Sequence, residues 1–156
     1  MPITDFRAFC EKRLQEKCLE QIQSDLQYGL KMEEEVCPIL EQHFADTLTK
    51  TSQYHTSDWV GEEGTFYELK SRKDILPTTY DTTIFPIYKC RIGENNRLIL
   101  VFHFSSNNHT YYIEYNKEKF SKYEYSWVSA CRNSDSAIKH YNIPIKDLIY
   151  IIPFTK

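Results

Sequence analysis

Residues Leu98–Phe104 form a strongly apolar run, LILVFHF. A run of this kind is typical of a strand at the centre of a sheet. A turn is predicted at 105–108, a strand at 111–115 and a last strand at about 149–153. These segments indicate a layered fold in which a sheet with a covered central strand organises the second half of the chain.

The first third of the chain has helical periodicity. Apolar residues recur at helical spacing over 4–24, and a second helical pattern covers about 24–48. Gly29 is expected to mark a break or a close packing contact, and Pro38 a kink or a new helix start. The apolar stripe of the second pattern is expected to comprise Leu26, Leu30, Val36 or Cys37, Leu40, Phe44 and Leu48.

The residue pattern changes from helical to strand-like after Lys50. Residues 51–73 predict a β-hairpin, with one strand near 53–60, a turn at 61–64 and a second strand near 65–72. Residues 80–92 predict a short helix interrupted near Pro86. Residues 117–140 match neither the helical nor the strand spacing of apolar residues and are ambiguous. The order of elements predicts one α/β (α+β) domain over 1–156, with a mixed central sheet flanked by helices. Its parts are helices at about 4–48, the hairpin at 51–73 and further sheet and helices at 80–156.

Composition narrows the class of protein. The sequence is 41% hydrophobic and 26% charged, which favours a globular chain over a disordered one. No apolar run approaches a membrane span, and the N-terminus lacks a signal-peptide core, so an intracellular protein, cytoplasmic or nuclear, is expected. The five cysteines have no paired spacing, which favours buried thiols in a reducing compartment.

Charge is distributed unevenly along the chain. The net charge is -3, but residues 1–69 carry 14 acidic and 6 basic side chains, whereas residues 70–156 carry 8 acidic and 13 basic ones. This asymmetry permits a basic face on an acidic protein.

The stretch that points to chemistry runs from Asp58 to Glu68-Leu69-Lys70. Alternation along a strand places Glu68 and Lys70 on one face and turns Leu69 toward the core. A hairpin turning at 61–64 brings Asp58 close to Glu68. Two carboxylates beside an ammonium group suit a hard divalent cation, which takes oxygen ligands and keeps several waters. The Leu69 carbonyl is a further candidate ligand, and the lysine can position an attacking water.

This arrangement resembles the PD-(D/E)XK nuclease superfamily. The matching positions are Asp58 and Glu68-Leu69-Lys70, and the resemblance adds an acidic residue from the preceding helix, for which Glu33 is the candidate because it falls on the apolar stripe. It implies a restriction-endonuclease-like core, Mg²⁺ or Mn²⁺ as cofactor, DNA as substrate and an endonuclease activity. KSRK at 70–73, followed by a segment containing Lys89, looks like small nucleases of large DNA viruses.

The match has departures and alternatives. Ser57 stands where the motif name has proline, and no glutamine follows at the position that some exonuclease branches use. Arg72 and Lys73 predict either phosphate contacts or a solvated strand end, and Lys89 is a weaker candidate for a backbone contact. A non-cleaving nucleic-acid-binding module with the same fold is the alternative function. Dimerisation, as in many relatives, is an expectation by analogy.

Other polar residues are expected to be structural. Glu34 and Glu35 should face solvent, and Glu62 and Glu63 should lie at the hairpin turn. The histidines lack the spacing of paired metal ligands, and His103 is expected to be buried within its strand.

Overall fold

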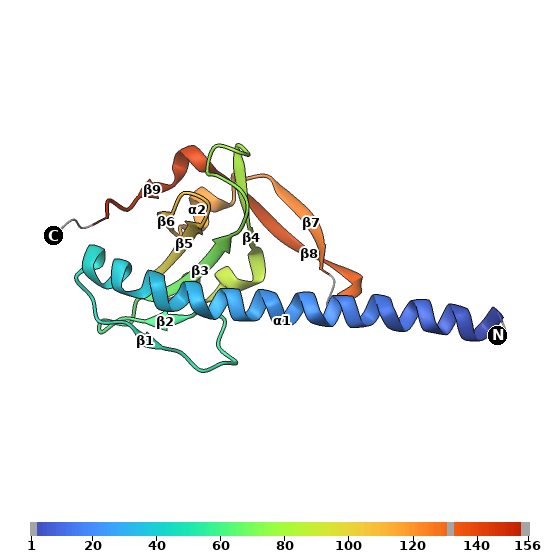
Figure 1. Ribbon diagram of the computed structural model, residues 1–156. Coiled ribbons are helices and arrows are strands. Elements are labelled where there is room, and N and C mark those ends of the chain that lie inside the picture. Colours follow the sequence, from blue (N-terminus) through green and yellow to red (C-terminus); the bar gives the residue numbers. More distant parts are fainter. Residues whose placement is uncertain (1–2, 131–132, 154–156) are drawn as a thin grey trace.

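The computed structural model describes residues 3–130 and 133–153, with the backbone alone for 3–14, 17, 129–130 and 133–136. It is an α+β protein in which one long helix lies across a mixed six-stranded sheet (Figure 1). The sheet has the order β1-β2-β3-β5-β6-β9. Its strands are β1 (Thr49–Lys50), β2 (Trp59–Val60), β3 (Phe66–Arg72), β5 (Leu98–Phe104), β6 (His109–Glu114) and β9 (Ile149–Tyr150). The β3–β5 pair is parallel and the other pairs are antiparallel.

A second, antiparallel sheet has the order β4-β8-β7. Its strands are β4 (Thr82–Pro86), β7 (Tyr125–Ala130) and β8 (Asn133–Pro144). The 3-10 helix η1 (Ile87–Glu94) connects β4 to β5, α2 (Lys117–Phe120) connects β6 to β7, and the 3-10 turn η2 (Ile145–Asp147) precedes β9. Pro86 ends β4, an edge strand, where its missing N–H leaves no gap in the pairing.

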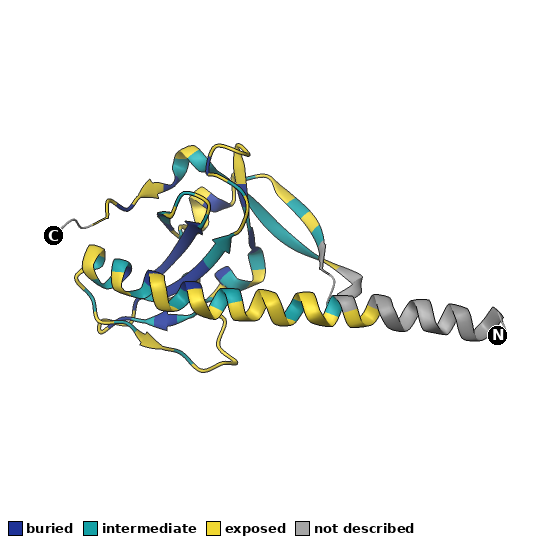
Figure 2. Ribbon diagram, in the orientation of Figure 1, coloured by how far each residue is buried: buried dark blue, intermediate teal, exposed yellow. Residues whose placement is uncertain are grey.

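The core has two parts, one on each face of the large sheet. Every residue of β5 is buried, as the apolar run predicted (Figure 2). Ile99 and Val101 pack with α1, whereas Leu100 and Phe102 pack with β4, β8, η1 and α2. The mixed central sheet is therefore confirmed, and β3 and β5 lie at its centre. The expectation that helices flank it holds for the face under α1 only, because the small sheet, with the short η1 and α2, covers the other face.

Helix α1 (Ile3–Phe44) is continuous, so the two predicted helices are one. It runs through Pro38 without a break. The buried stripe consists of Met32, Val36 and Leu40, whereas Leu26 and Leu30 are each 52% exposed and do not belong to it. The stripe shifts because only the C-terminal part of α1 lies against the sheet (Figure 1).

The C-terminus of α1 anchors the hairpin turn. Ala45 adopts a left-handed conformation at φ 49°, and the Asp46 N–H donates to the carbonyl of Glu41, which together form a Schellman-type end. The Asp46 carboxylate accepts from the Glu62 N–H at 2.9 Å and the Tyr67 hydroxyl at 2.9 Å. Gly61 has no room for a side chain there, since a Cβ would lie 1.9 Å from Asp46.

Several predictions need correction. The segment 80–92 is strand β4 followed by η1, not a helix interrupted near Pro86, because Thr82–Pro86 extends to pair with β8. Residues 53–58 form turns and bends, so the first hairpin strand is only Trp59–Val60. Among cysteines with described side chains, Cys37 and Cys90 are free as expected, but Cys18 is disulfide-bonded. None of the described helices is long and apolar enough to cross a membrane.

Candidate metal centre

Strand β3 places an acidic side chain inside the molecule. Tyr67 and Leu69 point toward α1 and join its core, as predicted for Leu69. The alternate residue Glu68 points to the opposite face and is only 3% exposed. It lies beside Leu100 of β5 in the parallel register. Burial of a carboxylate among apolar groups is unfavourable unless charges or a ligand compensate for lost hydration.

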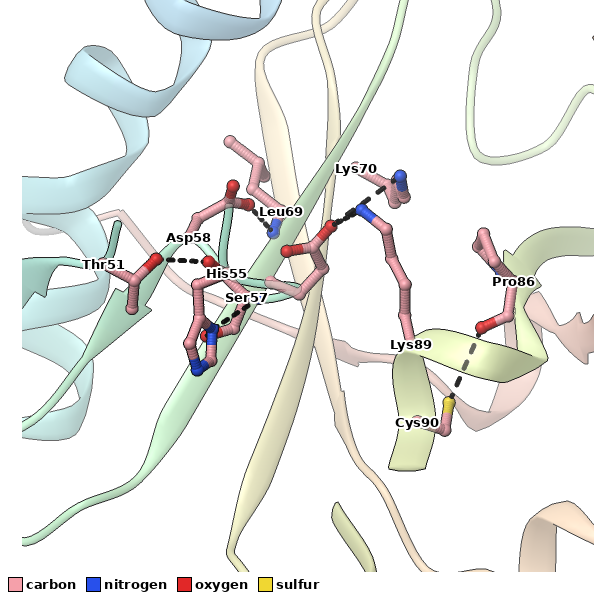
Figure 3. A network of polar contacts seen from close by, with 10 residues as sticks. Thr51, His55, Ser57, Asp58, Leu69, Lys70, Pro86, Lys89 and Cys90 are labelled. Carbon is pink, nitrogen blue, oxygen red and sulfur yellow. Dashed lines mark hydrogen bonds and ion pairs between the residues drawn. The ribbon is translucent and has the colours of Figure 1, made fainter. Parts of the chain in front are cut away.

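Two lysines approach one oxygen of Glu68. Lys89 of η1 donates from Nζ to Oε1 at 2.6 Å, and Nζ of Lys70 lies 3.7 Å from the same oxygen. The Lys70 and Lys89 side chains converge from β3 and η1 (Figure 3). The prediction that Glu68 and Lys70 share a face is confirmed by this contact.

The second carboxylate oxygen of Glu68, Oε2, differs from Oε1 in its hydrogen bonding. Oε2 is buried and has no hydrogen-bond partner among the side chains and backbone that the structure describes. Burial, followed by the negative charge of Asp58, raises the pKa of Glu68, while the charges of Lys89 and Lys70 oppose this rise. A buried carboxylate oxygen without a partner is destabilising, and a cation would relieve it.

Asp58 lies at the start of the hairpin, one residue before β2. Its carboxylate accepts from the backbone N–H of Leu69 at 2.7 Å, and its own N–H donates to the carbonyl of Tyr67 at 2.9 Å. Figure 3 shows the Asp58 side chain over Leu69. Asp58 is therefore fixed to β3 by its side chain and backbone, close enough to Glu68 for its charge to influence that carboxyl.

Glu33 lies on the other side of Asp58. Its Oε2 is 3.4 Å from Nζ of Lys50, and its side chain is 19% exposed. Burial and the neighbouring Asp58 carboxylate raise the pKa of Glu33, and Lys50 opposes them. Glu34 and Glu35 are exposed, as predicted. The three acidic residues thus form a row, Glu33 to Asp58 to Glu68, with the sheet between its ends.

This row is looser than a closed metal cage. Among the residues described, no group of three or more His, Cys, Asp or Glu side chains is arranged to hold a metal ion. Mg²⁺ is commonly bound by one or two carboxylates with waters completing its shell. Asp58 and the unpartnered oxygen of Glu68 fit that requirement, and Leu69 stays a predicted carbonyl ligand.

The environment of Lys70 weakens its hold on a proton. Burial, followed by the positive charge of Lys89, lowers the pKa of Lys70, and Glu68 opposes the change. Its Nζ lies 5.9 Å from the centre of the Phe85 ring. Lys70 is therefore a compact cation held against an apolar wall beside a carboxylate.

The two predicted phosphate-binding residues after the motif, Arg72 and Lys73, lie in different environments. Arg72 donates from Nε to the Thr83 hydroxyl at 3.1 Å and from Nη2 to the Ile84 carbonyl, which ties β3 to β4. Burial lowers the pKa of Arg72. Lys73 is exposed, with Nζ 5.7 Å from the Tyr28 ring. These contacts favour a structural role for Arg72 and leave Lys73 available to a phosphate.

A groove of about 480 Å³ separates α1 from β3 next to these residues. Glu33 lines it from α1, and Leu69, Lys70 and Lys73 line it from β3 and the following residue. Lys73 supplies positive charge along this wall. Of the acidic row, Glu33 lines this groove, whereas Glu68 is buried on the opposite face of β3.

Lys89 forms a charged cluster with Glu68 and Lys70. The sequence did not predict its contact with Glu68. Lys89 was singled out only as a backbone contact, because no spacing links it to Glu68. The available signal was Pro86, which favours an extended segment before it and a tight turn after it. That turn is η1, whose Lys89 reaches back to β3.

Comparison of the chain with protein-family models and with curated proteins finds no match. The geometry of the residues thus carries the functional argument.

Proposed function

We propose that this protein is a metal-dependent nuclease of the PD-(D/E)XK type, with a restriction-endonuclease-like core and DNA as its substrate. The observation that carries the proposal is Glu68, a buried carboxylate with one oxygen paired to lysine and the other without a partner among the described residues. A purely structural ion pair has no need of the second, unsatisfied oxygen. A divalent cation gives that oxygen a function.

The residues have distinct roles in this proposal. Asp58, Glu68 and the Leu69 carbonyl hold Mg²⁺, or Mn²⁺ in its place, and Glu33 supports Asp58 from α1. When bound, the cation offsets charge on a phosphate and makes a nearby water more acidic. Lys89 fixes Oε1 of Glu68 and thereby orients Oε2. Lys70 positions the attacking water and stabilises the charge that develops on the phosphate.

The alternative is a nucleic-acid-binding module of the same fold that does not cut. Two observations favour it: Lys89 already neutralises Glu68 at 2.6 Å, and the described acidic residues form a row with no closed cluster of three. In that case Lys70 and Lys73 serve binding alone. The two functions differ in their response to metal.

A cleavage screen tests the proposal. Labelled duplex, flap, junction and single-stranded DNA are incubated with the protein in Mg²⁺, Mn²⁺, Ca²⁺ or EDTA. We expect cleavage in Mg²⁺ and Mn²⁺, and binding with little cleavage in Ca²⁺, whose larger and looser oxygen shell activates water less well. Cleavage that persists in excess EDTA contradicts the proposed centre, and binding without cleavage under all conditions supports the non-cleaving module.

A further inference from the structure

The outer part of the small sheet exposes two aromatic rings on one face. Tyr125 is 56% exposed and Trp127 is 64% exposed. They are two residues apart on β7, so they point to the same side. Their partners on β8 are Tyr141 and Lys139. Tyr141 packs against the core, whereas Tyr125 and Trp127 lie farther out, where their rings stay in water.

A cation lies over one of these rings. Lys139 faces Trp127 in the strand register, and its Nζ is 3.8 Å from the centre of the Tyr125 ring. This contact holds the ammonium group over one aromatic face and keeps it at the surface. The face thus combines flat apolar rings with a fixed positive charge.

The same lysine lines a groove of about 420 Å³ between β8, η1 and α2. Arg91 of η1 and Lys117 of α2 add two further cations to its walls, and Tyr88 and Tyr115 add aromatic surface. The carboxylate of Glu94 in the groove is 3.6 Å from Lys117. Arg91 and Lys139 therefore provide positive charge beyond that pair, on a chain whose net charge is -3.

The groove is connected to the candidate centre through η1. Lys89, which holds Glu68, lies in this short helix between the groove residues Tyr88 and Cys90, and Arg91 follows them. With three residues per turn, successive side chains of a 3-10 helix point in different directions. One short helix thus borders the buried carboxylate on one side and the cationic groove on another.

We propose that this groove and the Tyr125–Trp127 face bind an unpaired stretch of nucleic acid, so that the substrate is a strand with a single-stranded segment. Cations in a groove follow phosphates, and exposed rings stack on bases, which are accessible only when unpaired. The inference deepens the proposed function, on which it rests, by naming the substrate class.

The test measures binding without cleavage. An oligothymidylate and an oligouridylate of about 12 nucleotides, within the range of single-strand sites, and a blunt-ended duplex are titrated in EDTA. The anisotropy of a fluorescent label on each nucleic acid gives the affinity of every variant, because this signal does not depend on Trp127. In the unaltered protein Trp59 is 2% exposed, so quenching of tryptophan emission reports in addition on Trp127. We expect Trp127→Ala to weaken single-strand binding about tenfold, as for loss of one base stack, and to leave duplex binding unchanged.

Matched variants separate stacking from general damage. Trp127→Phe keeps a ring and should retain most of the affinity, whereas Tyr80→Ala removes a ring of similar exposure (63%) elsewhere and should change nothing. Arg91→Ala should weaken binding and lower its salt dependence. An unchanged affinity in Trp127→Ala, an equal loss for the duplex, or no binding of either oligonucleotide overturns the inference.

The outcomes distinguish this inference from the proposed function. Binding that depends on Trp127, together with no cleavage in Mg²⁺, supports the groove and refutes the nuclease. Metal-dependent cleavage that Trp127→Ala leaves unchanged on every substrate supports the nuclease and refutes the groove.

Discussion

Charged side chains usually lie at the surface of a protein and large rings in its interior. The charged cluster of β3 and η1 and the exposed face of β7 depart from this distribution in opposite directions. Glu68, Lys70 and Lys89 are charged groups held inside or half-buried, whereas Tyr125 and Trp127 are large rings left in water. Both arrangements oppose stability, the first through lost hydration and the second through apolar surface that folding does not cover. Neither is needed to build the sheets. A buried charge and an uncovered ring each lower stability without contributing to the sheets, and such a loss of stability marks a candidate binding site.

The largest expected effect is on cleavage. Glu68→Gln removes a charged ligand without changing shape and should lower Mg²⁺-dependent cleavage by at least about a hundredfold, the scale of losing one major electrostatic contact at a reacting centre. Asp58→Asn should do the same. Glu63→Gln, an exposed turn residue, is the matched control. Circular dichroism checks the fold, and full activity in Glu68→Gln contradicts the assignment of the centre.

The next effect concerns stability within the cluster. Lys89→Met leaves Glu68 without its 2.6 Å partner and should reduce the free energy of unfolding by about 3 kcal/mol, as for breaking a buried pair. Lys70→Met, whose partner is at 3.7 Å, should cost less. Adding Glu68→Gln to Lys89→Met should restore much of the loss. Urea unfolding measures all three, and an additive double variant contradicts the coupling.

Arg72 and Lys73 test whether adjacent cations have different functions. Arg72→Ala should destabilise the protein by about 2 kcal/mol, because Thr83 and Ile84 lose their donor, with little change in the salt dependence of binding. Lys73→Ala should leave stability unchanged and reduce the salt slope by about one, the value for one phosphate contact. DNA affinity across a salt series measures the slope. A slope that changes in Arg72→Ala and not in Lys73→Ala reverses the assignment.

The smallest effect is a pH dependence of stability in EDTA. Since burial and Asp58 raise the pKa of Glu68, the folded state holds its proton more tightly than the unfolded state. The contribution of Glu68 to the free energy of unfolding is therefore full at acid pH and is lost as the pH rises through the folded-state pKa. The expected loss between about pH 5 and pH 8 is on the order of 2 kcal/mol. Glu68→Gln should lack this component. Thermal unfolding of both proteins over this range gives the difference, and parallel curves contradict the prediction.

The parts of the fold that sequence predicts are those with a local signal. The apolar run of β5 and the alternation through Glu68, Leu69 and Lys70 each specify burial within a few residues, and both expectations are confirmed. The mixed sheet follows from them. Gly29 does not break the helix and Pro38 does not start a new one, because packing along the C-terminal part of α1 supports a continuous helix.

The site was predictable only in part, because its pieces lie far apart in the chain. The spacing from Asp58 to Glu68 suggested a hairpin, and the hydrogen bond from the Leu69 N–H to Asp58 shows the resulting proximity. Lys89 was not placed in the cluster, since β4 was mistaken for part of a helix. The structural role of Arg72 depends on the same strand. One misassigned segment therefore concealed both contacts.

The parallel pairing of β3 with β5 has a consequence for how the protein is made. Glu68 lies opposite Leu100, and the segment between the two strands carries Lys89. Contacts between residues far apart in sequence form slowly, because a long loop must first close. A nascent chain that has not reached Phe104 lacks the neighbour that holds β3 in place. Under the proposed function, we expect a chain that ends before Phe104 to lack cleavage activity, because β3 and its Glu68 would have no fixed position.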